Sequence, residues 1–147
     1  MKILLVNQSR DHVSDKWLAK WVKGLSMRLI RRGYKQVKGR ELVLVFVNSG
    51  EIRRMNTLYR RKDYSTDILS FEPADETSLG ELVMCLPIIR SQAKRTGLSD
   101  RGELGYMIVH GVLHLLGHDH MKKEEELEMF ALQDALYSDL EKKVGLK

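Results

Sequence analysis

One stretch decides the fold expected of this chain: Asp100-Arg101-Gly102-Glu103-Leu104-Gly105-Tyr106-Met107-Ile108-Val109-His110-Gly111-Val112-Leu113-His114-Leu115-Leu116-Gly117. Its apolar residues fall on nearly every side of a helix, and a helix of that kind is buried. Asp100 and Glu103 have the spacing of an N-cap and its capping-box partner, with Ser99 as a competing cap, and Gly117 ends the helix. We therefore predict a central buried helix.

The segments around this helix alternate between strand and helix patterns. Strands are predicted over 2–8, 41–47, 67–71 and 80–86, and helices over 14–32, from Ser49 to about 59, from Pro87 to Gly97, and over 122–143. The run 41–47 is almost wholly apolar, which favours a strand covered on both faces. We predict one compact α+β domain over residues 1–147, with a small mixed sheet of about four strands and about five helices.

Composition places the chain among ordinary globular proteins. Of its 147 residues, 43% are hydrophobic and 31% are charged. Cys85 is the single cysteine, which excludes an internal disulfide and fits a reducing compartment. No stretch has the length of a bilayer span or of a signal-peptide core. We expect a cytoplasmic protein that does not enter a membrane.

The net charge of +5 is unevenly distributed along the chain. Residues 1–98 contain 19 Lys and Arg against 10 Asp and Glu, a balance of +9, whereas residues 99–147 have a balance of −4. A basic part of this kind can face a polyanion such as RNA. The sequence pI of about 9.3 is by itself a weak sign of nucleic-acid binding.

Three histidines at the end of the central helix predict a zinc site. His110 and His114 are four residues apart, so both imidazoles leave the same helix face. Gly117 allows a sharp turn that can bring His120 back as a third ligand. Three protein ligands leave one tetrahedral position open for water, as in catalytic zinc sites. Asp119 can orient a ligand imidazole, or it can simply form a turn.

Other interpretations of these histidines remain open. A histidine on an apolar helix is usually a hydrogen-bonded core residue, although three around a glycine turn are hard to explain in that way. His118 can be a fourth ligand that closes the site into a structural one, or it can point elsewhere. The spacing also overlaps the zinc-peptidase motif H-E-x-x-H, but Gly111 stands where that motif has its general base.

Three segments together resemble the YbeY family of bacterial zinc-dependent endoribonucleases, which take part in ribosomal RNA maturation. Residues 110–120 (HGVLHLLGHDH) resemble the pattern H-G-x-L-H-L-x-G-[YH]-D-H, and residues 56–71 resemble N-x-x-Y-R-x-K-D-x-P-T-D-V-L-S-F. Residues 80–85 match more weakly. Ser65 replaces the usual proline, and Glu81 replaces an aspartate. The similarity covers essentially the whole chain.

The resemblance implies one zinc ion at His110, His114 and His120, and substrate handling by Arg60. It also implies a single metal-dependent hydrolase domain and a preference for single-stranded RNA. The implied process is maturation of the 16S ribosomal RNA 3′ end and ribosome quality control. Ribosomal RNA and ribosomal small-subunit proteins are the implied partners.

Basic and acidic residues near the second motif are candidates for the chemistry. Arg60, with Arg61 and Lys62 beside it, can bind the phosphodiester and stabilise charge at phosphorus. Asp67 and Asp119 are candidates for general base or acid, although Asp67 equally suits the end of a strand. The attacking group is either water or the 2′-hydroxyl of the RNA.

Two rival functions follow from the same residues. The first is a ribosome-assembly factor without catalysis, in which zinc is structural and all its positions are filled. The second is a metallopeptidase, which the missing general base at Gly111 disfavours. Trp17 and Trp21, at helical spacing, are predicted core residues.

Overall fold

The structure is a computed structural model that describes residues 1–61, 67–118 and 122–147. The described residues form four strands, five α-helices and one 3₁₀ turn. In chain order these are β1 (Lys2–Asn7), α1 (Asp15–Arg31), η1 (Lys35–Val37), β2 (Glu41–Phe46), α2 (Ser49–Arg60), β3 (Ile68–Phe71), β4 (Ser78–Met84), α3 (Leu86–Thr96), α4 (Asp100–Leu115) and α5 (Lys123–Lys143). The predicted α+β domain with a small mixed sheet is confirmed.

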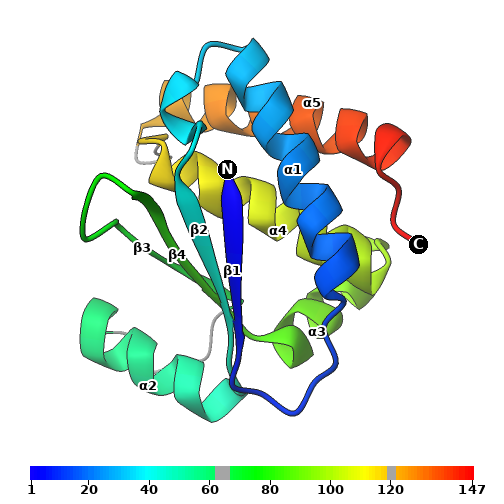
Figure 1. Cartoon of the computed structure of the whole chain (residues 1–147). Helices are drawn as coiled ribbons and strands as arrows, with labels where there is room; N and C mark the ends of the chain where they lie inside the picture. Colours follow the sequence, from blue (N-terminus) through cyan, green and yellow to red (C-terminus); the bar gives the residue numbers. More distant parts are fainter. Residues whose placement is uncertain (62–66, 119–121) are drawn as a thin grey trace.

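The four strands form one mixed sheet in the order β1-β2-β4-β3 (Figure 1). β1, β2 and β4 are parallel, and β3 runs antiparallel to β4 at the edge of the sheet. The parallel strands therefore all end at the same side, from which the chain continues into α1, α2 and α3.

The two faces of the sheet are covered unequally. Leu42, Leu44 and Phe46 of β2 are fully buried in the main core, which α1, α4 and α5 complete. The alternate side chains Val43 and Val45 are only partly buried, because α2 covers the other face with a smaller apolar cluster. The prediction that this strand is covered on both faces is thus correct for the face toward the main core. The face toward α2 is covered only in part.

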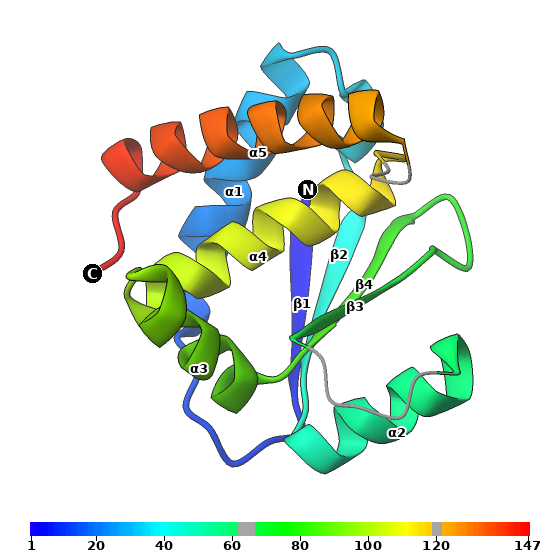
Figure 2. The ribbon, with the colours of Figure 1, turned by 180° about the vertical axis from the view of Figure 1, so that it is seen from behind.

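Helix α4 runs through the middle of the molecule, between α5 and the sheet (Figure 2). Ile108, Val109, Val112 and Leu113 have no exposed surface, which confirms the predicted central buried helix. Gly105 lets α1 approach closely, because a Cβ atom there would lie 2.6 Å from the Trp21 ring.

The helix ends follow the predicted chemistry with one difference, at α2, and α4 uses one of its two predicted caps. Ser14 caps α1, Gly97 follows α3 with a φ of 82°, and Pro87 lies in the first turn of α3, as predicted. Helix α2 is capped by Asn48, one residue before the expected Ser49, because the Asn48 side chain accepts the Glu51 N–H at 2.8 Å. At α4, Ser99 is the cap and accepts the Gly102 N–H.

Candidate metal centre

The C-terminal end of α4 turns sharply at Gly117, as the sequence predicts. Gly117 has a φ of 95°, its N–H donates to the His114 carbonyl at 3.0 Å, and the His118 N–H donates to the Leu113 carbonyl at 3.0 Å. This pair of bonds is the Schellman motif. It reverses the chain immediately after the two histidines of the helix.

His110 and His114 direct their imidazoles at each other. Their Nε2 atoms are 3.0 Å apart, and their ring centroids are 4.5 Å apart at an interplanar angle of 77°. Both side chains are partly buried, so their nitrogens reach solvent only in part. The two donors therefore meet at one point beside the helix, which is the arrangement that a shared cation requires.

Helix α5 fixes the orientation of the first imidazole. Gln133, which is 1% exposed, places its Oε1 atom 2.9 Å from Nδ1 of His110. An amide oxygen can only accept, so Nδ1 carries the proton and the lone pair of His110 lies on Nε2. Gln133 thus selects the tautomer that can bind a metal through Nε2.

His118 is directed away from this pair. Its Nε2 atom forms a 2.7 Å hydrogen bond with the Tyr34 hydroxyl, which follows α1. The two rings are also in tilted contact, with centroids 5.8 Å apart. A nitrogen engaged in this way does not serve as a further ligand of a metal at His110 and His114.

Gly111 allows α4 to lie directly on the sheet. A Cβ atom at this position would come within 2.6 Å of Leu82 and 2.9 Å of Ile68. The glycine thus serves the close packing of α4 against the sheet. A glutamate at position 111, where the zinc-peptidase motif has its general base, would meet these core side chains.

The donor set fits zinc as far as it is described. Two imidazole nitrogens converge, one of them with a buried partner that fixes its tautomer. His120 and Asp119 lie outside the described residues, so the predicted third ligand and its orienting carboxylate stay predictions. Within residues 1–61, 67–118 and 122–147, no group of three His, Cys, Asp or Glu side chains forms a complete metal site.

Asp67 belongs to a polar cluster beside the N-terminal half of α4. With its amide nitrogen facing the carboxylates, Gln92 of α3 donates to Oδ2 of Asp67 at 3.1 Å and to Oε1 of Glu103 at 3.2 Å. Glu103, which is 4% exposed, also accepts from the Thr96 hydroxyl. The cluster holds Asp67 at the start of β3, on the sheet side of α4.

The predicted phosphate-binding arginines lie at the end of α2. Arg60 is the last residue of the helix and is exposed. Arg61 is also exposed and ends the helix in the left-handed region, with a φ of 56°. Lys62 lies outside the described residues. Because α2 and α4 cover opposite faces of the sheet, Arg60 and the histidines come from different layers (Figure 1).

Sequence reasoning missed Gln133 and the Gln92–Glu103 pair. Gln133 is 23 positions beyond His110, in a helix whose remaining polar residues are mostly exposed. The only available signal was a glutamine in line with the inward-facing residues of α5, which Leu136 and Leu140 mark.

Comparison with known proteins covers the whole chain. The family model described as Endoribonuclease YbeY matches residues 4–141. A Bdellovibrio bacteriovorus protein named Endoribonuclease YbeY is 43% identical over 150 residues, covering 100% of both chains. A Bacillus licheniformis protein with the same name is 36% identical over 144 residues, covering 89% of this chain and 90% of its own.

The fold is also similar to a solved structure. The solution structure of a Thermotoga maritima protein matches with a TM-score of 0.68 and 25% identity, covering 96% of this chain and 90% of that chain. In the described part of the chain, every helix is too short or too polar to span a bilayer.

Proposed function

The chain belongs to the YbeY family of endoribonucleases, and we propose that it hydrolyses single-stranded RNA with one zinc ion held by His110, His114 and His120. The distance of 3.0 Å between the Nε2 atoms of His110 and His114, two of the three proposed ligands, supports this proposal most strongly. Three nitrogen ligands would leave one coordination position for water or substrate.

The protein residues divide the work of phosphodiester hydrolysis. When bound, zinc supplies a Lewis acid that polarises a phosphoryl oxygen and acidifies water. Gln133 keeps the Nε2 lone pair of His110 directed at the site. Arg60 binds the phosphate through two parallel hydrogen bonds and stabilises the charge that develops at phosphorus. Asp67 and Asp119 are the proposed acceptors or donors of the proton.

The proposed substrate is ribosomal RNA in the cytoplasm. The surplus of Lys and Arg over residues 1–98 supports a polyanionic partner. We propose that cleavage serves maturation of the 16S ribosomal RNA 3′ end and ribosome quality control, together with ribosomal small-subunit proteins. Family membership supports these assignments.

Charge reversal at Arg60 tests the assignment. Arg60→Glu is expected to retain zinc and fold while cleavage of single-stranded ribosomal RNA fragments falls at least about a hundredfold, because a carboxylate repels the phosphate. Arg54→Glu is the matched control on the same helix. Arg54 is exposed and paired with Glu51 at 2.6 Å, so its reversal should change cleavage less than about threefold.

Three measurements are needed to interpret the Arg60→Glu variant. Zinc content is measured by metal analysis, fold by circular dichroism, and cleavage on samples purified side by side with His114→Ala to detect contaminating ribonucleases. Unchanged cleavage by Arg60→Glu would remove Arg60 from the mechanism. A 2′,3′-cyclic phosphate product would assign the first attack to the 2′-hydroxyl, whereas its absence would favour water.

The rival functions make different predictions for the same samples. A structural zinc would make His114→Ala unfold the protein, and a peptidase would cleave a peptide library. His118 is engaged by Tyr34, which argues against a fourth histidine ligand and so against a closed structural site. The core packing at Gly111 argues against the peptidase arrangement.

A further inference from the structure

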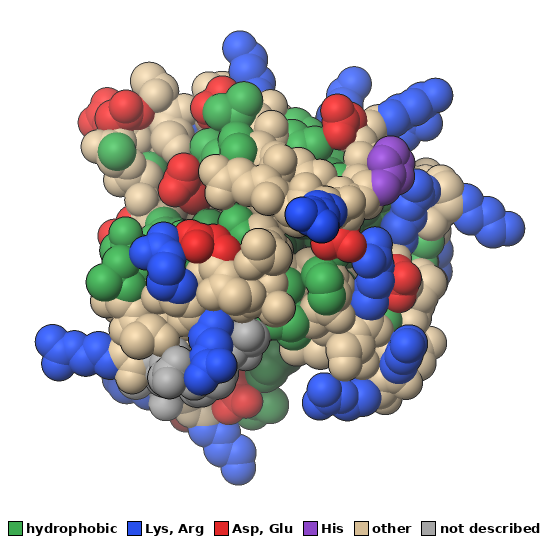
Figure 3. Space-filling model, turned by 90° about the horizontal axis from the view of Figure 1, so that it is seen from below, with side chains coloured by type: hydrophobic (Ala, Val, Ile, Leu, Met, Phe, Trp, Pro, Cys, Tyr) green, Lys and Arg blue, Asp and Glu red, His purple; other side chains and the backbone are tan. Residues whose placement is uncertain are grey.

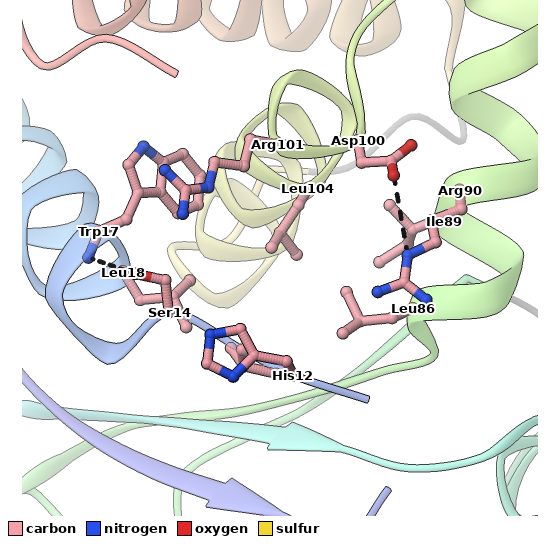
Figure 4. A pocket seen from close by; sticks show the side chains of 11 residues that line it. His12, Ser14, Trp17, Leu18, Leu86, Ile89, Arg90, Asp100, Arg101 and Leu104 are labelled. Atoms are coloured by element: carbon pink, nitrogen blue, oxygen red, sulfur yellow. Dashed lines mark hydrogen bonds and ion pairs between the residues drawn. The ribbon is translucent and has the colours of Figure 1, made fainter. Parts of the chain in front are cut away.

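A pocket of about 190 Å³ opens at the opposite end of α4 from the histidines (Figure 4). It lies between the start of α1, helix α3 and the first turns of α4. Its floor is apolar and its rim is polar. The floor and walls are built from Trp17, Leu18, Leu86, Ile89 and Leu104. A cavity of this size and composition accommodates one planar ring.

A second pocket of about 200 Å³ adjoins the first and is strongly cationic. The two share Ser14, Trp17 and Arg101. The second pocket is also lined by Lys16 and Lys20, on successive turns of α1, and by Lys147, and its described lining includes no Asp or Glu side chain. The apolar first pocket and the cationic second pocket are therefore neighbours, with the side chains of Ser14, Trp17 and Arg101 between them.

Arg101 lines both pockets, and among the described residues its guanidinium has a ring contact rather than an ion pair. Its guanidinium carbon lies 5.5 Å from the Trp17 ring centroid, over the ring. The Trp17 ring is itself fixed, because Nε1–H donates to the Gly145 carbonyl at 2.9 Å. By contrast, Arg90 on the far rim is bound to Asp11 at 2.8 Å and lies 3.8 Å from Asp100. Arg101 thus joins Lys16 and Lys20 as a cation that can contact an anionic ligand.

We propose that the two pockets together bind one nucleotide of single-stranded RNA, outside the catalytic centre. The base enters the apolar recess, and its phosphate contacts Arg101, Lys16 and Lys20. Flipped-out bases held between apolar and arginine side chains, with phosphates on nearby cations, are the usual chemistry of single-strand recognition. The view of the molecule from below shows Lys and Arg side chains projecting from many places on that face (Figure 3).

This site deepens the proposed function, on which it rests for the identity of the polymer. Arg101 and His114 lie thirteen residues apart on one straight helix, which is about 20 Å. A single strand bound here continues for several nucleotides before it reaches the histidines. The pocket would therefore hold the RNA at a fixed distance from the cut.

Nuclear magnetic resonance on the zinc-free full chain tests the site without requiring cleavage. Adenosine monophosphate should shift the Trp17 Nε1–H signal and the amides of Arg101 and Leu104. Its affinity should exceed that of adenosine alone, or of inorganic phosphate alone, at least tenfold, because each of these fills only one pocket. His114→Ala should bind the nucleotide as well as the native chain does, which separates this site from the proposed catalytic one.

Two matched double variants test the role of charge. Lys16→Glu with Lys20→Glu should weaken nucleotide binding at least tenfold, since two phosphate contacts become repulsive. Lys2→Glu with Lys23→Glu changes the net charge equally at exposed positions outside both pockets, and should stay within twofold. Arg101→Gln, which keeps the cover over Trp17 but removes its charge, should also weaken binding at least tenfold.

Several results would overturn the proposal. Shifts confined to residues 110–118 would place the nucleotide at the histidines instead. Equal losses in the two double variants would mean non-specific attraction. Binding of an acidic peptide without binding of the nucleotide would assign the pockets to a protein partner. Equal affinity for phosphate and nucleotide would leave the apolar recess without a ligand.

Discussion

The two ends of α4 present opposite designs on one helix. At its C-terminal end, nitrogens from His110 and His114 meet at one point, and a buried glutamine orients one of them. At its N-terminal end, an apolar recess lies beside spread cations, and Arg101 rests on a tryptophan. Nitrogen atoms that converge on one point suit a small ligand such as a metal ion. An apolar recess with positive charges spread around it suits a larger organic anion. In the functions proposed above, one end of the helix serves the reaction and the other end anchors the substrate.

Among the substitutions that test this comparison of the two ends, the largest loss of activity is expected at His114. His114→Ala should lose bound zinc and reduce RNA cleavage by about a thousandfold or more, because the remaining imidazoles no longer enclose the ion. Metal analysis and a cleavage assay measure both. Tyr106→Phe, which removes only a hydrogen bond from α4 to Asp134, should retain zinc and activity. Full cleavage by His114→Ala would refute the assignment of the metal centre.

The packing of the C-terminal half of α4 is expected to be the next most sensitive feature. Gly111→Ala should lower the free energy of unfolding by about 3 kcal/mol, because the added methyl group meets Leu82 at 2.6 Å and Ile68 at 2.9 Å. Urea denaturation measures the change. Gly50→Ala is the control, since its methyl group would meet only Asn48, at 3.5 Å. A neutral Gly111→Ala would show that α4 can shift away from the sheet.

Two glutamines that contact α4, the buried Gln133 and the partly buried Gln92, allow a sharper comparison of the two ends. Gln133→Leu should weaken zinc binding ten- to a hundredfold, because His110 loses the acceptor that fixes its tautomer. Gln92→Leu alters the Asp67–Glu103 cluster instead and should leave zinc affinity within about twofold. Competition with a chromogenic chelator measures both affinities. Equal losses in the two variants would indicate a general loosening of α4 rather than a role for Gln133.

The smallest effect is expected at His118. His118→Gln preserves a polar partner for Tyr34 and should leave one zinc ion bound per chain with little change in affinity. Metal stoichiometry and a chelator titration check this expectation. A loss of zinc would mean that His118 leaves Tyr34 to become a ligand, which would favour a closed, structural site.

Most of the helices and strands could be predicted from local patterns in the sequence. Residues 100–117 predicted a buried helix, and its bounds and burial agree, because an all-round apolar helix has only one stable environment. Ser14, Gly97 and Gly117 predicted helix ends through backbone chemistry that depends on immediate neighbours. The unequal covering of β2 was not predictable in this way, since it depends on the small size of the apolar surface that α2 offers.

The candidate site was predicted only where its residues are close in sequence. The spacing of His110 and His114 placed their nitrogens together without reference to any other element. Gln133 and Gln92 could not be assigned, because their partners lie in other elements of the fold and an amide that turns inward has no local signature. The nucleotide pocket is assembled from three helices, so no single segment of the sequence encodes its shape.

Two of the glycines of α4 have a consequence for how the proposed zinc site would be loaded. Gly105 touches Trp21 of α1 and Gly111 touches Leu82 of the sheet, and six residues place them about 240° apart around the helix. Close contacts on two sides of α4 prevent the helix from rotating about its axis. The two imidazoles are therefore aimed before any ion arrives, and loading should proceed without rotation of the helix.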